Sequence, residues 1–505
     1  MSIQENPIFL TQKRLVHRSG VLAAVLIAAL IGLSLLSGLI AYLAAPIAFN
    51  FHSPQEAGKT FYGWVIGVEI LVLVLGGFSR IARSLADDRK AGLWDSNRLT
   101  PLKPSQLVIG YWFGSPLREF YMGAALAGIG LIIIVLGKLS LTLWLGTQIL
   151  IASTALFFGL LAVLVGMAFQ RPQSGVLLLI AFVFLQTFSF SLPKFMVTNF
   201  ILPIYGIANL FNDNQNSEND YSHQAWGGLP QIFGFHIYPI LLSLGLQLVM
   251  GILLWRAAVR KTANPFQPLL LRWEALAMFG IIVAVQHGLM WGIWHGQFPT
   301  PIQSNQKFYD GQAMLPIVHI GTILIAVVLL AFASPQPERV RVEAMRFGFK
   351  NLGAVFSRSA ASLAIVLAAI VGLILFTQCA WSFTNAWKAY VVAVGNLLDF
   401  FLIFALLLEF CRLRFQRRAL GFVALWLFIL CALPFVLAGV FSTEAIGRMS
   451  LLSPGVVALG DPNSEEVNYL LGTVLAHFGV VVLLFIAWRN QWNRLLGKPM
   501  IAPPP

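Results

Sequence analysis

Charged residues are scarce in this chain: Asp, Glu, Lys and Arg together make up 10% of its 505 residues, whereas 58% are hydrophobic. A soluble domain is roughly one quarter charged and about half apolar, so this composition excludes an ordinary soluble protein. Cysteine is also scarce, with only Cys379, Cys411 and Cys431. Three dispersed thiols indicate no disulfide framework, and we expect them to be packing residues.

The sequence also lacks a phosphate-binding loop. The nearest match to a Walker A motif is Gly58-Lys59-Thr60, but Ser53 occupies the position of the first required Gly. That motif needs its glycines because the backbone N–H groups of the loop cradle the phosphates. The chain is therefore not expected to hydrolyse ATP by this chemistry, and no catalytic residue is predicted.

A metal site is not indicated either. His287 and His295 are eight residues apart, which on a helix is too far to share one tetrahedral ion unless the helix ends between them. The polar run Asn212–Asp220 lacks the fixed Gly and the ligand order of a calcium loop. A membrane metalloenzyme and a weak cation site at 212–220 are the less favoured alternatives.

What the chain does have is about twelve long apolar segments of about 18–25 residues. As helices they are long enough to cross a hydrocarbon core of roughly 30 Å, which predicts an all-α polytopic membrane protein. The first segment is too long for a signal-peptide core and is expected to remain. The expected spans are 21–45, 62–80, 116–137, 141–169, 175–193, 236–256, 273–293, 314–333, 361–380, 389–411, 418–441 and 467–488.

Lys and Arg alternate sharply between the gaps that separate these segments. If the N-terminus and every second gap form one side, the other side holds only six of the 33 Lys and Arg residues. Because basic residues stay on the cytoplasmic side of membrane proteins, both termini are predicted to be cytoplasmic. The basic residues are spread over many short segments, which does not indicate nucleic-acid binding. The six external ones are Lys59, Lys138, Lys194, Lys307, Lys388 and Arg448.

The order of the gap lengths repeats halfway along the chain. In each set of six segments the largest cytoplasmic gap follows the second, at 81–115 and 334–360. The longest external gap precedes the sixth, at 194–235 and 442–466. This order favours a duplicated six-helix unit, a common way to build transporters. The two expected halves are 1–260 and 261–505.

A short sequence echo precedes each half. Asn6-Pro7-Ile8 stands before the first span and Asn264-Pro265-Phe266 before the seventh. Pro is tolerated at a helix start, where its missing N–H would be unpaired anyway. The stretches that follow, Ile8 to Arg18 and Leu269 to Trp273, suit helices that lie in the membrane interface. The dipeptide alone can also recur by chance.

The gap 81–115 is polar enough to leave the membrane yet too patterned for an idle linker. The acidic and basic run Asp87–Arg89 precedes a short amphipathic helix expected over 93–99. A break framed by Pro101 and Pro104 separates it from the helix that follows. We therefore expect two short helices joined by a bend at the cytoplasmic face.

This gap resembles the loop after the second helix in ABC transporter permeases of the second export class. In that family an acidic-basic run, a Gly, an acidic residue and Leu-(Ser/Thr)-Pro-Leu precede a Gly that opens the third helix. The cytoplasmic termini, the amphipathic entry helix and the long gap before the sixth helix are also similar. Trp94 and Tyr111 depart from the family pattern. The matching residues are Asp88, Arg89, Gly92, Asp95, Leu99, Thr100, Pro101, Leu102 and Gly110.

In the second half the gap 334–360 lies in the matching place but lacks Leu-Thr-Pro-Leu. We interpret it as a diverged copy, so that one chain supplies both halves of a permease and needs no second copy. The candidate docking residues of this gap are Glu338, Arg339 and Glu343.

The resemblance implies a division of labour. In this family the cytoplasmic loops dock on a separate P-loop ATPase that binds ATP and Mg²⁺, and closure of two ATPase copies rocks the membrane halves. It implies that this chain is a non-enzymatic exporter permease in the cytoplasmic membrane of a prokaryote and binds no cofactor itself. The docking residues implied in the first half are Asp87, Asp88, Arg89, Gly92, Trp94, Asp95, Leu99, Thr100, Pro101 and Leu102.

Two other readings of these patterns stay open. The run Leu85–Arg89 resembles the signature after the second helix of major facilitator transporters, although Ser84 replaces its leading Gly and the gap is far longer than their usual tight turn. A membrane scaffold without transport is the third reading. Trp94, expected to be solvent-exposed beside charged residues, has the composition of a docking surface, but a single Trp is as commonly placed at the lipid headgroups.

Ionisable residues inside the spans are costly and mark candidate functional sites. Glu69 lies near the middle of the second span, His319 in the eighth, and Asp399 near the middle of the tenth with Asn396 one turn before it. A Glu69–His319 contact would neutralise both residues. Alternatively, each group is satisfied by a neighbouring Ser, Thr or backbone carbonyl.

Overall fold

The computed structural model shows a helical chain that forms two compact units. Unit 1 comprises Met1–Pro230 and Phe235–Pro265, and unit 2 comprises Gln231–Gly234 and Phe266–Pro505. The division after Pro265 lies close to the boundary expected between the two halves. The structure describes residues 6–18, 20–44, 53–99, 101–168, 197–211, 230–265, 267–294, 322–323, 325–334, 352–382, 387–415, 467–496 and isolated positions from 422 to 458.

Eight of the described helices are long and apolar enough to cross a membrane, so the protein is a multi-pass helical membrane protein. One of them runs without interruption through three labelled segments. The eight are α2 (Val21–Ala44), the helix α3 (Pro54–Ile70), η3 (Leu71–Gly76) and α4 (Gly77–Lys90), α7 (Leu117–Leu136), α8 (Leu141–Ala168), α13 (Pro239–Ala263), α14 (Arg272–Trp294), α19 (Trp387–Phe415) and α24 (Val467–Leu496).

The remaining expected spans are covered only in part. Helix α18 (Ala360–Ser382) occupies the expected span 361–380. Of the span expected at 314–333, the described part is helical over 325–333. The span expected at 175–193 lies outside the described residues, as does most of 418–441. Twelve spans and cytoplasmic termini therefore stay predictions.

The second membrane helix is longer than the sequence indicated, because it continues to Lys90 instead of ending near residue 80. Its last turns keep an apolar face: Ile81 and Leu85 are buried, and α4 packs against α8. The two helices approach closely at Gly166, where a Cβ would lie 3.0 Å from the Leu85 Cβ. The charged residues of α4 lie on its other faces. Because they make the segment polar on average, the sequence analysis ended the helix too early.

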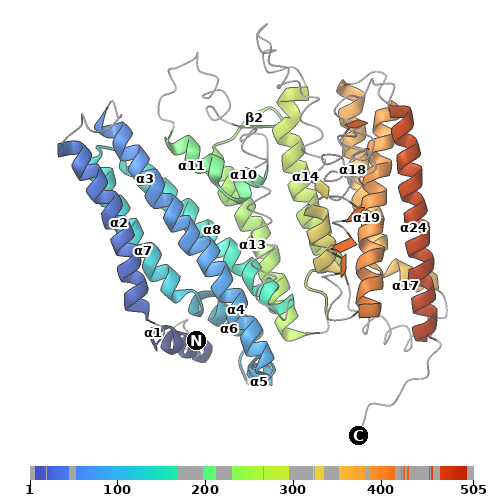
Figure 1. Ribbon diagram of the computed structural model, residues 1–505, viewed down its shortest axis with the longest axis horizontal. Helices are drawn as coiled ribbons and strands as arrows, with labels where there is room; N and C mark the ends of the chain where they lie inside the picture. The colour runs from blue at the N-terminus through green and yellow to red at the C-terminus, as the bar shows by residue number, and fades with distance from the viewer. Residues whose placement is uncertain are drawn as a thin grey trace. The chain divides into compact units, whose positions relative to one another are not determined.

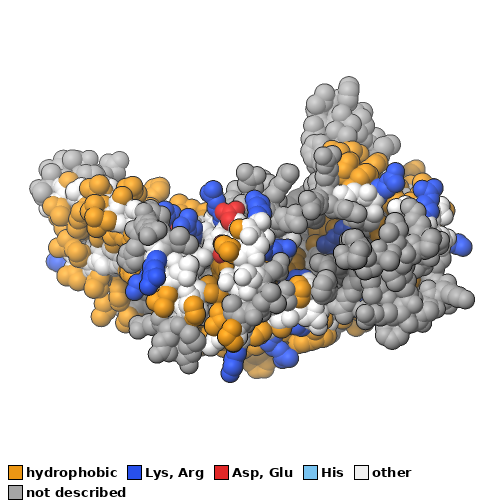
Figure 2. Space-filling model, turned by 90° about the horizontal axis from the view of Figure 1, so that it is seen from below, with side chains coloured by type: hydrophobic (Ala, Val, Ile, Leu, Met, Phe, Trp, Pro, Cys, Tyr) orange, Lys and Arg blue, Asp and Glu red, His pale blue; other side chains and the backbone are white. Residues whose placement is uncertain are grey.

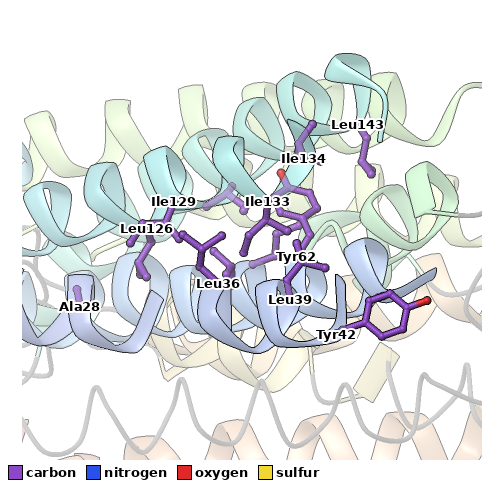
Figure 3. Packing of buried hydrophobic residues seen from close by; sticks show 14 residues of the cluster. Ala28, Leu36, Leu39, Tyr42, Tyr62, Leu126, Ile129, Ile133, Ile134 and Leu143 are labelled. Atoms are coloured by element: carbon purple, nitrogen blue, oxygen red, sulfur yellow. The ribbon is translucent and has the colours of Figure 1, made fainter. Parts of the chain in front are cut away.

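The apolar core of unit 1 lies where α2, α3 and α7 pack together (Figure 3). Leu39, Tyr62, Leu126 and Ile133 are fully buried there. By contrast, α2 exposes a row of large apolar side chains such as Leu22 and Leu30. An apolar exposed face on a membrane helix is what contact with lipid requires.

Three short helices lie together at one end of unit 1 (Figure 1). They are α1 (Pro7–Arg18), α5 (Leu93–Leu99) and α6 (Pro104–Gly114). Helix α1 packs along α6, and the Asn6 side chain joins them, since its Oδ1 accepts from the Ile8 N–H at 3.0 Å and its Nδ2 donates to the Gln106 carbonyl at 2.6 Å. The first expected short helix is thus present, beginning at Pro7, and its place in the membrane interface stays a prediction.

The second sequence echo does not begin a helix, which corrects the expectation for Leu269 to Trp273. Asn264 follows the last residue of α13 in an extended conformation, and Pro265 lies in a turn. Helix α14 begins only at Arg272. Because Pro268 closely follows Pro265, the segment between these helices is too short and too rigid to form a helix of its own.

The long gap before α13 contains ordered structure that the sequence did not indicate. Helices α10 (Thr198–Ile201) and α11 (Ile204–Phe211) pack against α13, and α11 also packs against α8. Gln247 of α13 joins α10 to α8, because its Nε2 donates to the Ile201 carbonyl of α10 and to the Thr154 hydroxyl of α8, each at 2.9 Å. Two short strands follow, β1 (Gln231–Ile232) and β2 (Phe235–His236).

In unit 2, α18 and α24 both pack against α19. The carboxylate of Glu409, on α19, accepts hydrogen bonds from the Ala360 N–H at the start of α18 and from Trp488 Nε1 of α24 at 2.8 Å. Helix α17 (Leu352–Ser357) precedes α18, and Arg272 donates to the Ser357 and Ser359 carbonyls. One buried acid therefore holds three helices at the same level.

Candidate functional site

The segment that follows α4 is the candidate site, and it has the two-helix form expected from the sequence. Gly92 has a φ of +73°, a left-handed conformation that lets the chain turn sharply between α4 and α5. Pro104 begins α6, and the side-chain oxygen of Gln106 accepts from the Lys103 N–H at 2.9 Å. The bend between α5 and α6 thus has its own helix-start hydrogen bond.

Tyr111 of α6 lies at the centre of this segment and is fully buried. Its hydroxyl donates to Asp88 Oδ2 at 2.6 Å and accepts from Asn97 Nδ2 at 3.5 Å. Burial raises the pKa of Tyr111, and the Asp88 carboxylate raises it further. The hydroxyl therefore stays protonated as a donor, and one side chain joins α4, α5 and α6.

Trp94 packs against this tyrosine, with the two ring centroids 5.5 Å apart. Its side chain is 6% exposed, so the expectation of a solvent-exposed tryptophan is wrong. The sequence places Trp94 beside charged residues, but the amphipathic helix turns it toward α6. Trp94 therefore contributes to a docking surface only indirectly, by packing α5 against α6 on the buried side of the segment.

Arg89 connects the segment to a membrane helix. Its guanidinium donates to the Gly166 carbonyl at 3.3 Å and to the Met167 carbonyl, both in the last turn of α8. The last carbonyls of a helix lack intrahelical partners, so a basic donor stabilises them and the helix dipole. Movement of α4 is thereby linked to the end of α8.

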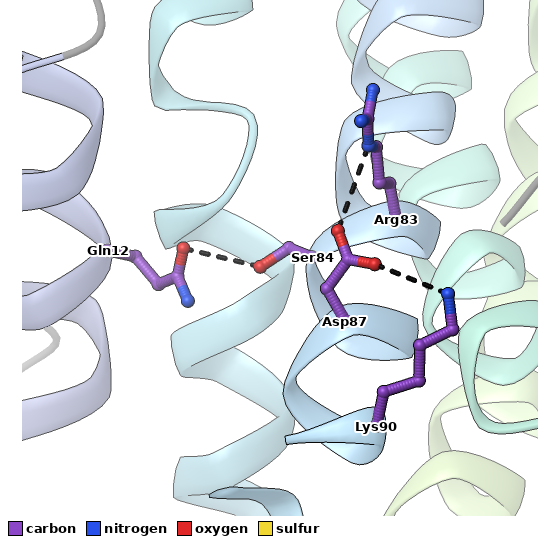
Figure 4. A network of polar contacts seen from close by, with 5 residues as sticks. All are labelled: Gln12, Arg83, Ser84, Asp87 and Lys90. Carbon is purple, nitrogen blue, oxygen red and sulfur yellow. Dashed lines mark hydrogen bonds and ion pairs between the residues drawn. The ribbon is translucent and has the colours of Figure 1, made fainter. Parts of the chain in front are cut away.

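Asp87 faces outward, as do its ion-pair partners Arg83 and Lys90. It lies 3.7 Å from Arg83 and 3.8 Å from Lys90, and these exposed ion pairs contribute little to stability (Figure 4). In the same network the Ser84 hydroxyl donates to Gln12 at 3.3 Å, which ties α4 to α1. Asp87 is therefore available to a partner at small cost.

The exposed edge of the segment combines charge with apolar surface. Leu93 is 53% exposed, and Gly92, Pro101 and Lys103 are also exposed. Figure 2 views the molecule from the side on which α1 and α5 lie, where Lys and Arg side chains stand among hydrophobic ones. A single exposed leucine among charged groups is common on protein surfaces and does not by itself indicate a protein contact.

The other predicted docking residues are placed as follows. Asp88 and Leu102 are half-buried. Asp95 and Leu99 belong to α5, whose described side chains do not include theirs. Thr100, and the second-half candidates Glu338, Arg339 and Glu343, lie outside the described residues.

The intramembrane candidates are all buried where they are described. Glu69 is 2% exposed, and its Oε2 accepts from Gln148 Nε2 of α8 at 3.0 Å. Asn396 and Asp399 are buried in α19, and Asp399 Oδ2 has no hydrogen-bond partner among the described residues. His319 lies outside the described residues, so the Glu69–His319 contact stays untested.

Two residues of these sites were missed by the sequence analysis. Gln148 interrupts an apolar run, which is the signal that should have marked it as the partner of Glu69. Tyr111 was noted only as a departure from a family pattern, yet it holds the segment together. A polar group in an apolar stretch is informative because burial forces it to find a partner.

Comparison with known proteins adds no family to this geometry. The chain matches no protein-family model, no curated protein and no solved structure. Among the described residues no group of three or more His, Cys, Asp or Glu side chains is arranged to hold a metal ion. The function must therefore be argued from the segment itself.

Proposed function

We propose that this chain is the membrane-spanning permease of an ATP-driven exporter of the ABC class, in the cytoplasmic membrane of a prokaryote. Separate P-loop ATPase subunits dock on the segment 87–110, and two of them serve the two halves of the chain. The observation that carries the proposal is the bent pair of helices α5 and α6, which directly follows the end of α4 that Arg89 holds to α8.

The segment has the properties of a force-bearing contact. Its outer edge offers Asp87 and Leu93 to a partner, while Tyr111 and Trp94 brace it from within. A surface that must transmit movement needs such a rigid backing, because a loose loop would absorb the displacement. The buried backing distinguishes this segment from an ordinary connecting loop.

Three connections lead from the segment into the membrane helices. Helix α4 is continuous with η3 and α3, so a push on residue 88 acts along one helix. Arg89 transfers the same movement to α8. Helix α6 adds a third contact, since Trp112 packs on Trp255 of α13 with ring centroids 5.8 Å apart. Docking at one edge can thus shift three spans together.

The mechanism follows from this arrangement. Closure of the ATPases on ATP moves the docking segments, and the spans attached to them expose a pathway to alternate sides of the membrane. The second docking segment is 335–359, the corresponding gap of the second half. Because the spans are rich in apolar residues, the walls of such a pathway would suit lipids, lipid-linked molecules or peptides as cargo.

The first test is affinity purification from the native host in mild detergent, followed by identification of the ATPase. Two ATPase copies per chain are expected. One copy per chain would contradict docking on the second half. No ATPase, with proton- or sodium-driven uptake surviving in vesicles, would instead support a secondary transporter.

A second test measures the coupling between ATP hydrolysis and transport, in variants first checked for unchanged helicity. In proteoliposomes with the ATPase, replacing Asp88, Arg89 and Leu99 together by Ala is expected to leave ATP hydrolysis but to lower transport at least tenfold. The matched control is the exposed pair Thr11 and Lys13 of α1, replaced by Ala. Normal coupling in the triple variant would remove the docking claim.

A further inference from the structure

Glu69 forms a closed polar pair between two membrane helices. Its carboxylate accepts from Gln148 of α8 at 3.0 Å. Seven residues earlier on α3, the fully buried Tyr62 hydroxyl lies 2.5 Å from that of Thr147, next to Gln148. Because Glu69 is only 2% exposed and Thr147 fully buried, a proton is the ligand small enough to reach this carboxyl.

The helix changes its hydrogen-bond pairing directly after this residue. The π-helix η3 begins at Leu71, two residues beyond Glu69, and ends at Gly76. Such wide turns are rare, are less regular than α-helix and occur frequently at functional sites. A π-turn can convert to α pairing by shifting each hydrogen bond by one residue. It is therefore an element with two discrete arrangements.

A second buried carboxyl lies at the other end of η3. A Cβ on Gly76 would be 3.4 Å from Glu119 Cγ. Glu119 is 3% exposed, its Oε1 is bound to Arg118 at 2.8 Å, and its Oε2 has no hydrogen-bond partner among the described residues. The π-turn is thus enclosed between two buried acids.

The helices packed against α3 bring few other charges to Glu69. Helix α8 contains no ionisable residue, and α2 contains only Tyr42. On α7 the ionisable residues are Arg118, Glu119 and Tyr121, near its start beyond η3. Lys59, on α3 itself, donates to the Phe211 carbonyl at 2.9 Å. The charge at this site therefore changes through Glu69.

We propose that Glu69 is a proton-binding site and that its protonation switches η3 between π and α pairing. An ionised carboxylate only accepts hydrogen bonds, so it needs the Gln148 N–H group. A protonated carboxyl also donates, so it can pair with the Gln148 carbonyl after the amide turns over. Only an O–H bond forms, with the proton taken from water. The proposal does not depend on the exporter function.

The test is a pH titration of the purified full chain in lipid nanodiscs by infrared difference spectroscopy. The wild-type protein is expected to show a protonated-carboxyl C=O band of Glu69 that titrates together with an amide I change. Glu69→Gln is expected to lose both signals. The control Asp399→Asn removes an equally buried carboxyl on α19 and is expected to keep both. Persistence of either signal in Glu69→Gln would overturn the proposal.

Two further variants keep the test decisive if Glu69→Gln does not fold. Glu69→Asp retains a titratable carboxyl on a shorter side chain and is expected to shift the midpoint. Gly76→Ala favours α pairing in the segment and is expected to shift the same midpoint. An unshifted midpoint in Glu69→Asp would show that another group titrates, and an unshifted midpoint in Gly76→Ala would refute the link to η3.

Discussion

The two units join corresponding helices at their predicted cytoplasmic ends, but the arginine comes from opposite partners. In unit 1, Arg89 on the second membrane helix donates to the last carbonyls of the fourth, α8. In unit 2, Arg412 on the corresponding fourth helix, α19, donates to the carbonyls of Ala331 at 3.1 Å and Ser334 at 3.4 Å, at the end of the helix that contains 325–333.

This reversal indicates what the predicted duplication of a six-helix unit would have to preserve. The last carbonyls of a helix need donors, and a charged donor from either neighbouring helix satisfies them. The pair of helices therefore needs one charged donor at this end, and either helix can carry it. A comparison of the two halves by aligned residues would miss the similarity.

The buried acids differ in the same way. In unit 1, Glu119 lies in the first turn of α7 itself, where it is bound to Arg118. In unit 2, the acid at the start of α18 is Glu409 of the neighbouring α19, which is also bound to Trp488. In unit 2 a single carboxylate, that of Glu409, therefore bonds to both α18 and α24. In unit 1 the Glu119 carboxylate bonds, among the described residues, only to the adjacent Arg118, and other residues join the helices.

The largest expected effect is therefore at Glu409. Glu409→Leu leaves the Trp488 and Ala360 N–H groups buried without a partner and removes the negative charge near Arg272 and Arg412. Removing one member of a buried charged network costs about 3–5 kcal/mol of stability. The measurement is the loss of helicity on SDS titration in mixed micelles.

The matched variant is Glu119→Leu. This side chain has a single ion-pair partner, Arg118, and an oxygen without a hydrogen bond among the described residues. Its loss is expected to cost about 1 kcal/mol. Equal effects of the two variants would mean that the two units distribute their interactions alike, contrary to the comparison.

The next effect concerns the two arginines. Arg89→Met and Arg412→Met each remove hydrogen bonds from a charged donor, worth about 1.5–3 kcal/mol, and similar destabilisation is expected in the same SDS titration. A transport assay should distinguish the two variants, because only Arg89 lies within a docking segment that the structure describes. Arg89→Met should lower transport per ATP hydrolysed more than Arg412→Met does. The opposite order would place the stronger coupling in unit 2.

How far the sequence predicted these features depends on the range of the interactions. Apolar run length located α2, α7 and α8 within a few residues, because crossing a membrane is a local requirement of one helix. The end of α4 was misplaced, since its burial depends on α8, which lies far along the chain.

In the candidate site, too, the features set by the local chain were predicted better than those set by packing between helices. The break framed by Pro101 and Pro104 was predicted correctly, because proline acts on the backbone where it stands. The sharp turn lies at Gly92, after the acidic and basic run Asp87–Arg89, which is helical. The direction of Trp94 was wrong, and Tyr111 was undervalued, because each depends on the packing of one short helix on another. The Gln148 partner of Glu69 is likewise separated from it by a whole helix.

The smallest expected effects distinguish the inner and outer sides of the docking segment. Tyr111→Phe keeps the ring against Trp94 and removes the hydrogen bond to Asp88, which should cost about 1 kcal/mol of stability and weaken coupling. Asp87→Asn removes only exposed ion pairs and should cost about 0.5 kcal/mol or less. If an ATPase contacts the outer edge, however, Asp87→Asn should raise the dissociation constant measured for that ATPase in detergent, while Tyr111→Phe should leave it nearly unchanged. The reverse result would mean that the partner binds a surface other than the exposed edge of this segment.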